Sequence, residues 1–257
     1  MTKRIGIFVI AYNAETTLTH VLERIPAEIV AKVEEIFVID DCSPDKTYDI
    51  GRSYADGPAA AKLTVQRNPV NLMYGGNQKR GYEYAVERGL DIVVLLHGDG
   101  QYAPEVMQRL LEPLETGRAE MVMGSRMLES RAALKGHMPL YKYFGNKILT
   151  WTQNRLLGTR FSEFHSGYRA YATQALRTAN LSSMTNSWHF DTQIILEFLR
   201  QHYRIVEVPI PTYYGDEICH VNGVPYAYQC VKATLQFAWR NRWKQHLALH
   251  ASQRPTE

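Results

Sequence analysis

The sequence predicts an α/β protein with a doubly wound, mostly parallel sheet that carries helices on both faces. Two observations support this class. Short β-branched runs alternate with helical patterns through residues 4–127, and polar clusters follow four of these runs directly. Strand–helix–strand alternation is typical of parallel sheets whose faces are both covered by helices. Ligands of such sheets bind at the carboxyl ends of the strands, which is where the polar clusters stand.

Five buried strands are expected in the first half of the chain. They cover residues 4–12, 33–43, 61–68, 91–100 and 119–126. Helical spacing of apolar residues predicts three helices between them, at residues 14–29, 45–55 and 104–117. Residues 74–89 are expected to form a loop that leads into a fourth helix. Pro104 suits the first turn of its helix, because the N–H that proline lacks has no partner there.

The pattern changes after residue 127. The elements expected there are helices at 141–158, 189–203 and 225–250, a loop with a short strand at 161–172, and a strand at 204–214. The two prolines of that last strand favour a sheet edge, because proline cannot donate to a neighbouring strand. The segment 215–223 is either a loop that closes over a site or an ordinary solvated loop. A single domain, residues 1–257, is the simplest organisation.

The composition of the chain indicates its expected partners and cellular compartment. The chain has 257 residues, 45% of them hydrophobic, and a net charge of +3, so a nucleic-acid partner is not indicated. Its three cysteines are widely spaced, which favours a reducing compartment over a disulfide framework. The sequence shows no signal-peptide pattern and no apolar run of about 18 residues. A soluble, cytoplasmic protein is therefore expected.

Asp40 and Asp41 close the second expected strand. Adjacent strand residues point to opposite sides, so at most one of them faces the crevice. Asp41, together with Ser43, Asp45 and Thr47, could contact a ribose or a base. Ser43 or Asp45 could instead cap the helix that follows, because short oxygen-bearing side chains are favoured at that position.

Asp99 and Gln101 follow the fourth expected strand and are separated by one glycine. Both side chains can then point to the same side and place oxygen atoms on one ion, as Mg²⁺ or Mn²⁺ would require. Gly98 and Gly100 allow the backbone to approach a diphosphate. The alternative is a glycine turn in which Asp99 bonds its own backbone. His97 is either a further ligand or a structural residue.

Three further segments carry weaker signals. Arg126 could bind a phosphate through two N–H groups, or be a surface arginine. Residues 75–81, GGNQKRG, could bind phosphate through backbone amides, although they lack the dinucleotide fingerprint. Glu163 could act as a general base towards an acceptor hydroxyl, or simply be exposed.

Seven segments between residues 4 and 215 form a recognisable series. They read VIAYNAETTLTHVL, VIDDCSPDKT, NLMYGGNQKRGYEYA, VVLLHGDGQYAP, VMGSRM, EFHSGYRAY and FDTQIILEFLRQHYRIVEVPI. In this order they resemble the family-2 inverting glycosyltransferases, above all the dolichyl- or polyprenyl-phosphate sugar synthases. The resemblance implies a GT-A fold and a nucleotide-diphosphate sugar as donor. It also implies a nucleotide-sugar-binding half at 4–127, an acceptor-side half at 128–225 and a helical tail at 226–257.

The resemblance implies roles for individual residues. The nucleotide sugar would be bound by Ala11, Tyr12, Asn13, Glu15, Asp41, Gly76, Lys79, Gly98 and Asp99. A divalent metal, Mg²⁺ or Mn²⁺, would be held by Asp99, Gln101 and His97. Phosphate groups of donor or acceptor would be contacted by Arg126, Ser166 and Arg169. Catalysis would depend on Asp99, Arg126 and Glu163.

Three departures from the family pattern bear on the chemistry. His97 stands at the first aspartate of the D-x-D-x-Q metal site, and a neutral imidazole suits Mn²⁺ better than Mg²⁺. The other ligands of that site and the diphosphate could then hold the metal alone. Glu163 replaces an aspartate in the D-x-x-S-G-F-R pattern, which keeps the charge and lengthens the reach. Ala14 stands where an acidic residue is usual, with Glu15 as its substitute.

The resemblance implies metal-dependent, inverting transfer of a sugar to either a polyprenyl phosphate or a sugar hydroxyl. A base is needed only for a hydroxyl, so Glu163 would deprotonate in one case and position in the other. Two alternatives stay open, a non-catalytic nucleotide-sugar-binding scaffold and a nucleotidyltransferase. The basic, aromatic tail at 226–257 either contacts the inner face of a membrane peripherally or packs as an amphipathic helix.

Overall fold

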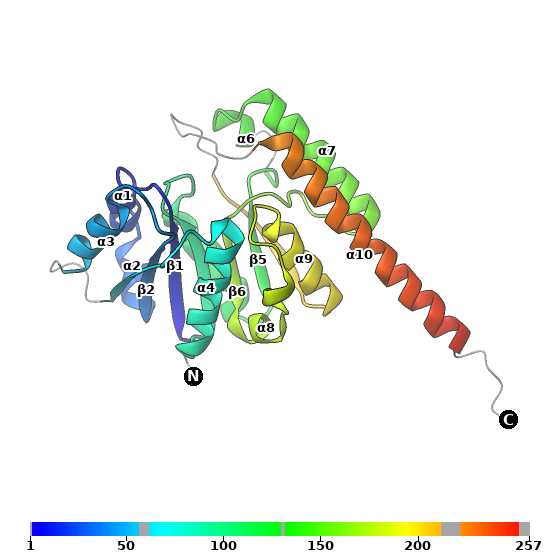
Figure 1. Cartoon of the computed structure of the whole chain (residues 1–257), viewed down its shortest axis with the longest axis horizontal. Helices are drawn as coiled ribbons and strands as arrows, with labels where there is room; N and C mark the ends of the chain where they lie inside the picture. The colour runs from blue at the N-terminus through cyan, green and yellow to red at the C-terminus, as the bar shows by residue number, and fades with distance from the viewer. Residues whose placement is uncertain (1, 57–61, 130–131, 212–221, 252–257) are drawn as a thin grey trace.

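Figure 1 shows the computed structural model of the chain. The structure describes residues 2–56, 62–129, 132–211 and 222–251. Most of the 215–223 segment, which the sequence suggested as a closing loop, therefore lies outside the described residues, as does the end of the tail beyond residue 251.

One mixed sheet of seven strands runs through the described part of the chain, in the order β3-β2-β1-β4-β6-β5-β7. The strands are β1 (Ile5–Ala11), β2 (Glu35–Asp40), β3 (Leu63–Arg67), β4 (Ile92–His97), β5 (Met121–Ser125), β6 (Arg169–Ala172) and β7 (Ile205–Pro209). Only β6 runs antiparallel to its neighbours β4 and β5. The predicted class, a mostly parallel sheet, is confirmed. β7 lies at the edge, as its prolines indicated.

The expected helices are present with two differences, and two short helices, Ala132–Lys135 and Thr173–Thr178, were not expected. The helices are α1 (Leu18–Glu23), α2 (Ala27–Lys32), α3 (Thr47–Ala55), α4 (Met73–Glu87), α5 (Met107–Glu115), α6 (Ala132–Lys135), α7 (Leu140–Leu157), α8 (Thr173–Thr178), α9 (Phe190–Arg200) and α10 (Gly223–Ala251), with short 3₁₀ turns at Pro104–Val106 and Leu181–Ser183. The single helix expected at 14–29 is broken before Pro26, which cannot continue an α-helix. The loop expected at the start of 74–89 is helical, because α4 already begins at Met73.

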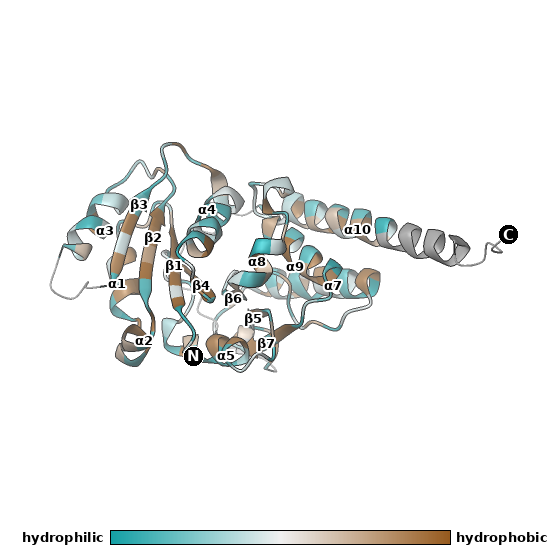
Figure 2. Ribbon diagram, turned by 90° about the horizontal axis from the view of Figure 1, so that it is seen from below, coloured by the Kyte–Doolittle hydropathy of each residue, from teal (hydrophilic) through white to brown (hydrophobic). Residues whose placement is uncertain are grey.

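The sheet separates two hydrophobic cores, one on each face. Alternate residues of β1 point into different cores, Val9 into the first and Phe8 into the second. The first core includes residues of α1, α2 and α5, and the second those of α4, α8 and α9. Gly81 of α4 lies directly on Phe8, where a Cβ would come within 2.1 Å of the ring. Helices therefore cover both faces of the hydrophobic strands, as predicted (Figure 2).

Helices α7 and α10 pack side by side beyond the sheet (Figure 1). Inside this pair, Gln153 Nε2 donates to Thr234 Oγ1 at 3.3 Å. Large apolar side chains remain exposed on both helices: Leu140, Tyr141, Phe144, Ile148 and Trp151 on α7, and Val224, Tyr228, Leu235 and Trp239 on α10. We call these nine residues the outer stripe. Within the described residues, no helix combines the length and the apolar character that crossing a membrane requires.

Candidate active site

A crevice lies at the carboxyl ends of the parallel strands. β1 and β4 are neighbours, but the strands that follow them in the chain lie on opposite sides of this pair. Such a switch point leaves a crevice beyond the strand ends, where α/β proteins bind ligands. Ala11 and His97, the last residues of β1 and β4, both line a pocket there.

This first pocket, which we call the β1–β2 pocket, has a volume of about 640 Å³. Among the residues predicted to bind the nucleotide sugar, Ala11, Tyr12, Asn13, Asp41 and Asp99 line it. The backbones of two lining residues, Asn13 and Met73, adopt left-handed φ angles of 52° and 65°. Such conformations cost roughly 1–3 kcal/mol outside glycine and cluster at ligand sites.

Of the two aspartates after β2, Asp41 faces the β1–β2 pocket. Its Oδ1 accepts hydrogen bonds from Asn68 Nδ2 and from the Leu72 N–H, both at 2.8 Å. These bonds fix the carboxylate at the pocket wall. Asp40 turns away and accepts the N–H of Ser43, and burial raises the pKa of Asp40 above its ordinary value.

Ser43, Asp45 and Thr47 hold the loops behind this pocket. Ser43 Oγ accepts the N–H of Asn13 at 3.0 Å, and Thr47 Oγ1 accepts the N–H of Ala14 at 2.8 Å. Asp45 Oδ1 accepts the N–H of Thr47 at 3.0 Å. Ser43 therefore does not cap the helix that follows, whose N-cap is Lys46, whereas Asp45 bonds the first residue of that helix, Thr47.

The turn after β4 presents Asp99 to two pockets at once. The Asp99 side chain is 46% exposed, and its Oδ2 lies 3.9 Å from His97 Nδ1. Its Oδ1 accepts the N–H of Gln101 at 3.0 Å, across Gly100 with a φ of 80°. Burial acts to raise the pKa of Asp99, but the nearby imidazole and the Gln101 amide outweigh it and keep this pKa below its ordinary value. The segment therefore forms the glycine turn that the sequence suggested, and the turn exposes an ionised carboxylate to both pockets.

The chemistry of this turn fits a divalent cation that takes few ligands from protein. Mg²⁺ usually binds one or two carboxylates and takes its remaining ligands from phosphates and water. Asp99 supplies one carboxylate, Gln101 an amide oxygen and His97 an imidazole, all lining both pockets. Among the described residues, no group of three or more His, Cys, Asp or Glu side chains gathers as a preformed cage.

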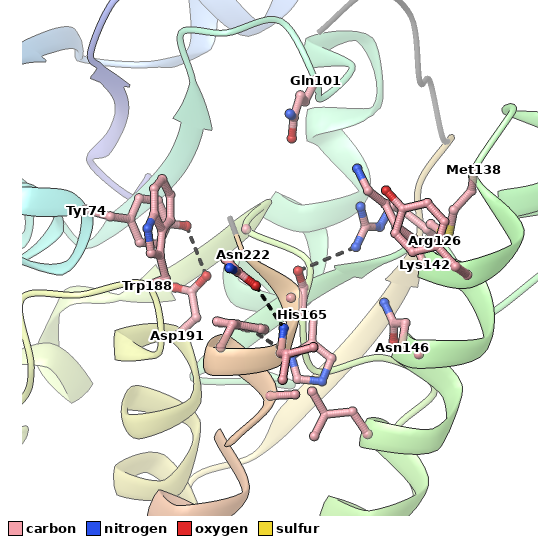
Figure 3. Close-up of a pocket in the computed structure, with 18 of the residues that line it drawn as sticks. Tyr74, Gln101, Arg126, Met138, Lys142, Asn146, His165, Trp188, Asp191 and Asn222 are labelled. Atoms are coloured by element: carbon pink, nitrogen blue, oxygen red, sulfur yellow. Dashed lines mark hydrogen bonds between the residues drawn. The ribbon is translucent and has the colours of Figure 1, made fainter. Parts of the chain in front are cut away.

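The second pocket, which we call the α7–α10 pocket, has a volume of about 730 Å³ and adjoins the first through the Asp99 turn. Figure 3 shows Arg126, Lys142 and Asn146 on one side of it, opposite Tyr74 and Trp188. Two cationic side chains therefore reach one wall. An anion that enters this pocket would meet them there.

Arg126, just after β5, forms a buried ion pair with Glu163. Their side chains are 12% and 0% exposed. Arg126 donates its backbone N–H to Oε2 at 2.8 Å and its Nε to Oε1 at 3.0 Å, and Asn146 Nδ2 donates to Oε1 at 2.7 Å. Burial acts to raise the pKa of Glu163, but these cationic and N–H partners outweigh it and hold the pKa below its ordinary value. Glu163 is therefore a weak base, and its bonds hold Arg126 in place.

Glu207 of β7 holds the loop that carries Glu163. Glu207 accepts the backbone N–H of Ser162 at 2.8 Å and that of Glu163 at 3.0 Å. Next along the loop, His165 Nδ1 lies 2.9 Å from the Tyr226 hydroxyl of α10. Burial lowers the pKa of His165 to about 3, so this pocket residue is neutral at physiological pH.

Several residues predicted for the site lie outside both pocket linings. Gly76 is buried in the first turn of α4, and Gly98 is buried with its N–H bonded to a β1 carbonyl. Lys79 Nζ donates to the Met184 carbonyl at 2.8 Å. Glu15 accepts the N–H of Lys46 at 3.1 Å. The expected contacts of these residues with the nucleotide sugar thus find no support in the geometry.

Arg169 requires a correction. It is fully buried and donates to the carbonyl oxygens of Ser166, Asp191 and Phe164 at 2.8, 2.8 and 2.9 Å. A guanidinium with these three partners braces the backbone and does not reach a phosphate. Ser166 is also buried, and its Oγ accepts the N–H of Tyr168 at 3.3 Å. Both residues support the loop from inside.

Among the pocket-wall residues that sequence reasoning missed are Tyr74, Lys142, Asn146 and Trp188. Lys142 and Asn146 lie one turn apart on α7, so a polar pair in an aromatic helix was a usable signal. Tyr74 stacks on Trp188 with ring centroids 4.8 Å apart. No local pattern indicated this stack, because it joins the starts of α4 and α9 through the fold.

Solved structures with the same architecture support the fold assignment. The crystal structure of glucosyl-3-phosphoglycerate synthase from Mycobacterium tuberculosis in complex with Mn²⁺, uridine diphosphate and phosphoglyceric acid matches with a TM-score of 0.67. The match covers 92% of this chain and 78% of that one at 17% identity, so it concerns the fold alone. The expectation of a GT-A fold is confirmed.

Sequence comparison is more specific. The undecaprenyl-phosphate mannosyltransferase of Micrococcus luteus is 32% identical over 183 residues, which span 68% of this chain and 70% of that protein. The UDP-N-acetylglucosamine–dolichyl-phosphate N-acetylglucosaminyltransferase of Methanococcus voltae is 27% identical over 224 residues, 83% of this chain and 87% of that protein. Residues 6–178 match the family described as Glycosyl transferase family 2. The chain therefore belongs to glycosyl transferase family 2.

Proposed function

We propose that this chain transfers a sugar from a nucleoside-diphosphate sugar to a polyprenyl phosphate, with inversion at the anomeric carbon and with Mg²⁺ or Mn²⁺. One observation carries the proposal: two pockets of similar size meet at the exposed carboxylate of Asp99. The names of the two relatives above specify undecaprenyl and dolichyl phosphate. The solved neighbour was crystallised with Mn²⁺ and uridine diphosphate.

The β1–β2 pocket is the donor site in this proposal. Asp41 is held rigidly at its wall and can accept hydrogen bonds from a ribose or a base. The diphosphate then points towards the Asp99 turn, where Asp99 and Gln101 hold the cation and His97 stands beside them. The cation, when bound, supplies Lewis-acid stabilisation of the leaving diphosphate.

The α7–α10 pocket is the acceptor site. A lipid phosphate is already ionised, so its oxygen can attack the anomeric carbon without a base. Arg126 and Lys142 reach the same wall and can orient this anion. Glu163, which the sequence suggested as a base, is instead paired with Arg126 and holds its guanidinium in place. The geometry therefore favours a phosphate over a hydroxyl as acceptor.

Replacing Glu163 with glutamine separates the two acceptor classes. We expect turnover with undecaprenyl phosphate to fall by no more than about tenfold, since losing a general base costs about 10²–10⁴-fold and Glu163 is not used as one. Glutamine keeps one oxygen for Arg126 but loses the charge. The measurement is kcat in a transfer assay with Mn²⁺, UDP- or GDP-sugars and undecaprenyl phosphate.

The surface pair of Glu105 and Arg24, at 2.8 Å, provides the matched control, and Glu105→Gln should leave kcat unchanged. A loss beyond about 10²-fold in Glu163→Gln would restore the hydroxyl-acceptor reaction if the rate of the native chain also rises with pH through a single ionisation. Donor binding with no transfer to either acceptor class would instead support the non-catalytic scaffold.

The acceptor proposed here is a lipid, and the outer stripe offers a place to meet its membrane. The stripe begins beside the α7–α10 pocket, because Tyr141 and Val224 belong to both. Neither helix contains an acidic residue, while Lys142, Lys147 and Arg155 on α7 and Lys232 on α10 are basic. A cationic, aromatic face suits an anionic bilayer surface better than a second copy of itself, which would carry the same charge.

Removing two stripe aromatics should weaken this contact. We expect Phe144→Ser/Trp151→Ser to bind vesicles of phosphatidylglycerol and phosphatidylcholine at least about tenfold more weakly, because each buried aromatic contributes about 1.5–3 kcal/mol. Co-sedimentation measures the binding. Val70, exposed on the loop after β3, gives the control Val70→Ser, which should bind as the native chain does. Unchanged vesicle binding, or a dimer in solution that the double variant dissolves, would contradict membrane contact.

A further inference from the structure

The structure encloses the imidazole of His97 tightly. The rings of Tyr74 and Tyr102 meet it edge-on, with centroids 5.7 and 4.9 Å away. Gly167 lies against it, and a Cβ there would come within 2.6 Å of Nε2. The His97 side chain is 13% exposed. Packing therefore sets the orientation of this ring, and only glycine at position 167 leaves room for it.

A hydrogen-bond relay reaches Nε2 of this ring. Nε2 lies 3.3 Å from the Tyr74 hydroxyl, which donates to Asp191 Oδ2 at 3.0 Å. Asp191 is buried at the start of α9, and its Oδ1 accepts Gln78 Nε2 at 3.1 Å and lies 3.5 Å from Arg169 Nη1. A carboxylate only accepts hydrogen bonds, so the phenol proton points to Asp191. The phenol oxygen is then left to accept a proton from Nε2.

This arrangement lets His97 keep a proton on Nε2 when a cation takes the place of any proton on Nδ1. With the proton on Nε2, the lone pair is on Nδ1, the nitrogen that lies 3.9 Å from Asp99 Oδ2. His97 and Asp99 line the same two pockets, so both side chains could hold one cation there. Histidines that bind metals usually donate their other N–H to a carboxylate or carbonyl, which selects the tautomer. Here Tyr74 stands between His97 and the carboxylate.

We propose that Asp191 and Tyr74 are positioning residues that present His97 Nδ1 to the cation, and that the Asp99 turn consequently prefers Mn²⁺ to Mg²⁺. The inference rests on the proposed function, because it takes the Asp99 turn as the metal site of that reaction. Mg²⁺ strongly favours oxygen ligands, whereas Mn²⁺ accepts an imidazole nitrogen in place of a carboxylate. The relay thus adapts the site to the loss of the aspartate that the family pattern has at position 97.

The test measures metal binding without turnover. Electron paramagnetic resonance of free Mn²⁺ gives its affinity for the full chain with UDP, and competition gives that of Mg²⁺. We expect Tyr74→Phe and His97→Ala to weaken Mn²⁺ binding by about tenfold to 100-fold, the usual cost of losing a ligand's support, and to leave Mg²⁺ binding unchanged. Tyr54→Phe, which removes a phenol of α3 outside both pockets, is the control and should affect neither metal.

A second variant distinguishes the relay from general support of the fold. His97→Asp should reverse the preference in favour of Mg²⁺, and adding Tyr74→Phe to it should change neither affinity, because an aspartate has no tautomer to select. Nitrogen-15 shifts of His97 in the metal-free chain should show a protonated Nε2.

Three results would overturn the inference: an equal loss of both metals in Tyr74→Phe, an undiminished effect of Tyr74→Phe in the His97→Asp chain, or an unprotonated Nε2 of His97. In these cases the proposed glycosyl transfer still stands, since the native chain binds a metal with UDP. If the native chain with UDP binds neither Mn²⁺ nor Mg²⁺, the metal-dependent reaction fails and this inference fails with it.

Discussion

Asp99→Ala is expected to lower the turnover number of sugar transfer by about 10²–10³-fold, the range found when one preorganised electrostatic group is removed from a transition state. In the described part of the chain, Asp99 is the one carboxylate that lines both pockets. Removing it takes away the anionic ligand beside the leaving diphosphate, and with it the cation that would stabilise the developing charge. The kcat of the transfer assay with undecaprenyl phosphate measures the effect.

The control lies at the other end of the same strand. Asp91 precedes β4 and accepts the N–H of Arg4 at 2.8 Å, which asparagine can also do. Asp91→Asn should therefore keep full turnover. A UDP-dependent rise in melting temperature on adding Mn²⁺ should disappear in Asp99→Ala alone, because a ligand stabilises only a protein that binds it. Turnover of Asp99→Ala within about tenfold of the native value would rule out this metal role.

Arg126→Met is expected to destabilise the fold by about 3–5 kcal/mol, as well as to abolish detectable transfer, because it leaves the buried Glu163 carboxylate without its cation. The carboxylate cannot turn to solvent, since its loop is held by Glu207 through two backbone N–H groups. Urea unfolding followed by circular dichroism measures the loss of stability.

The double variant Arg126→Met/Glu163→Met separates stability from catalysis. Replacing both charges by apolar groups of similar size should recover most of the unfolding free energy, but none of the activity. The folded-state pKa of Glu163 lies below 4.5, so its pairing stabilises the native chain fully above about pH 4.5 and is lost as the pH falls through that folded pKa. The double variant should lack this acid-dependent loss. A double variant that regained transfer would refute a phosphate-orienting role for Arg126.

Elements governed by neighbouring residues could be predicted. Strands β1, β2, β4 and β5 are runs of aliphatic residues buried on both faces, and the polar residues that follow them belong to the same local pattern. The Asp99 turn was predictable for that reason, since strand, glycines and carboxylate are contiguous. Helix α4 was not. Its Gly75 donates to the Asn186 carbonyl at 2.7 Å, and a Cβ there would come within 2.7 Å of Phe190, so the start of this helix depends on α9.

By itself, the sequence determined the α/β class, the family and the position of the acidic turn, because each depends on short-range pattern and chain order. The tertiary structure decided what the charged side chains do. Arg169 reads like a phosphate ligand but is buried on three carbonyls, and Glu163 reads like a base but is neutralised by Arg126. Tyr74 meets Asp191 across 117 positions of sequence. Burial and partner choice set the protonation and reach of such groups, and both arise only when distant segments pack together.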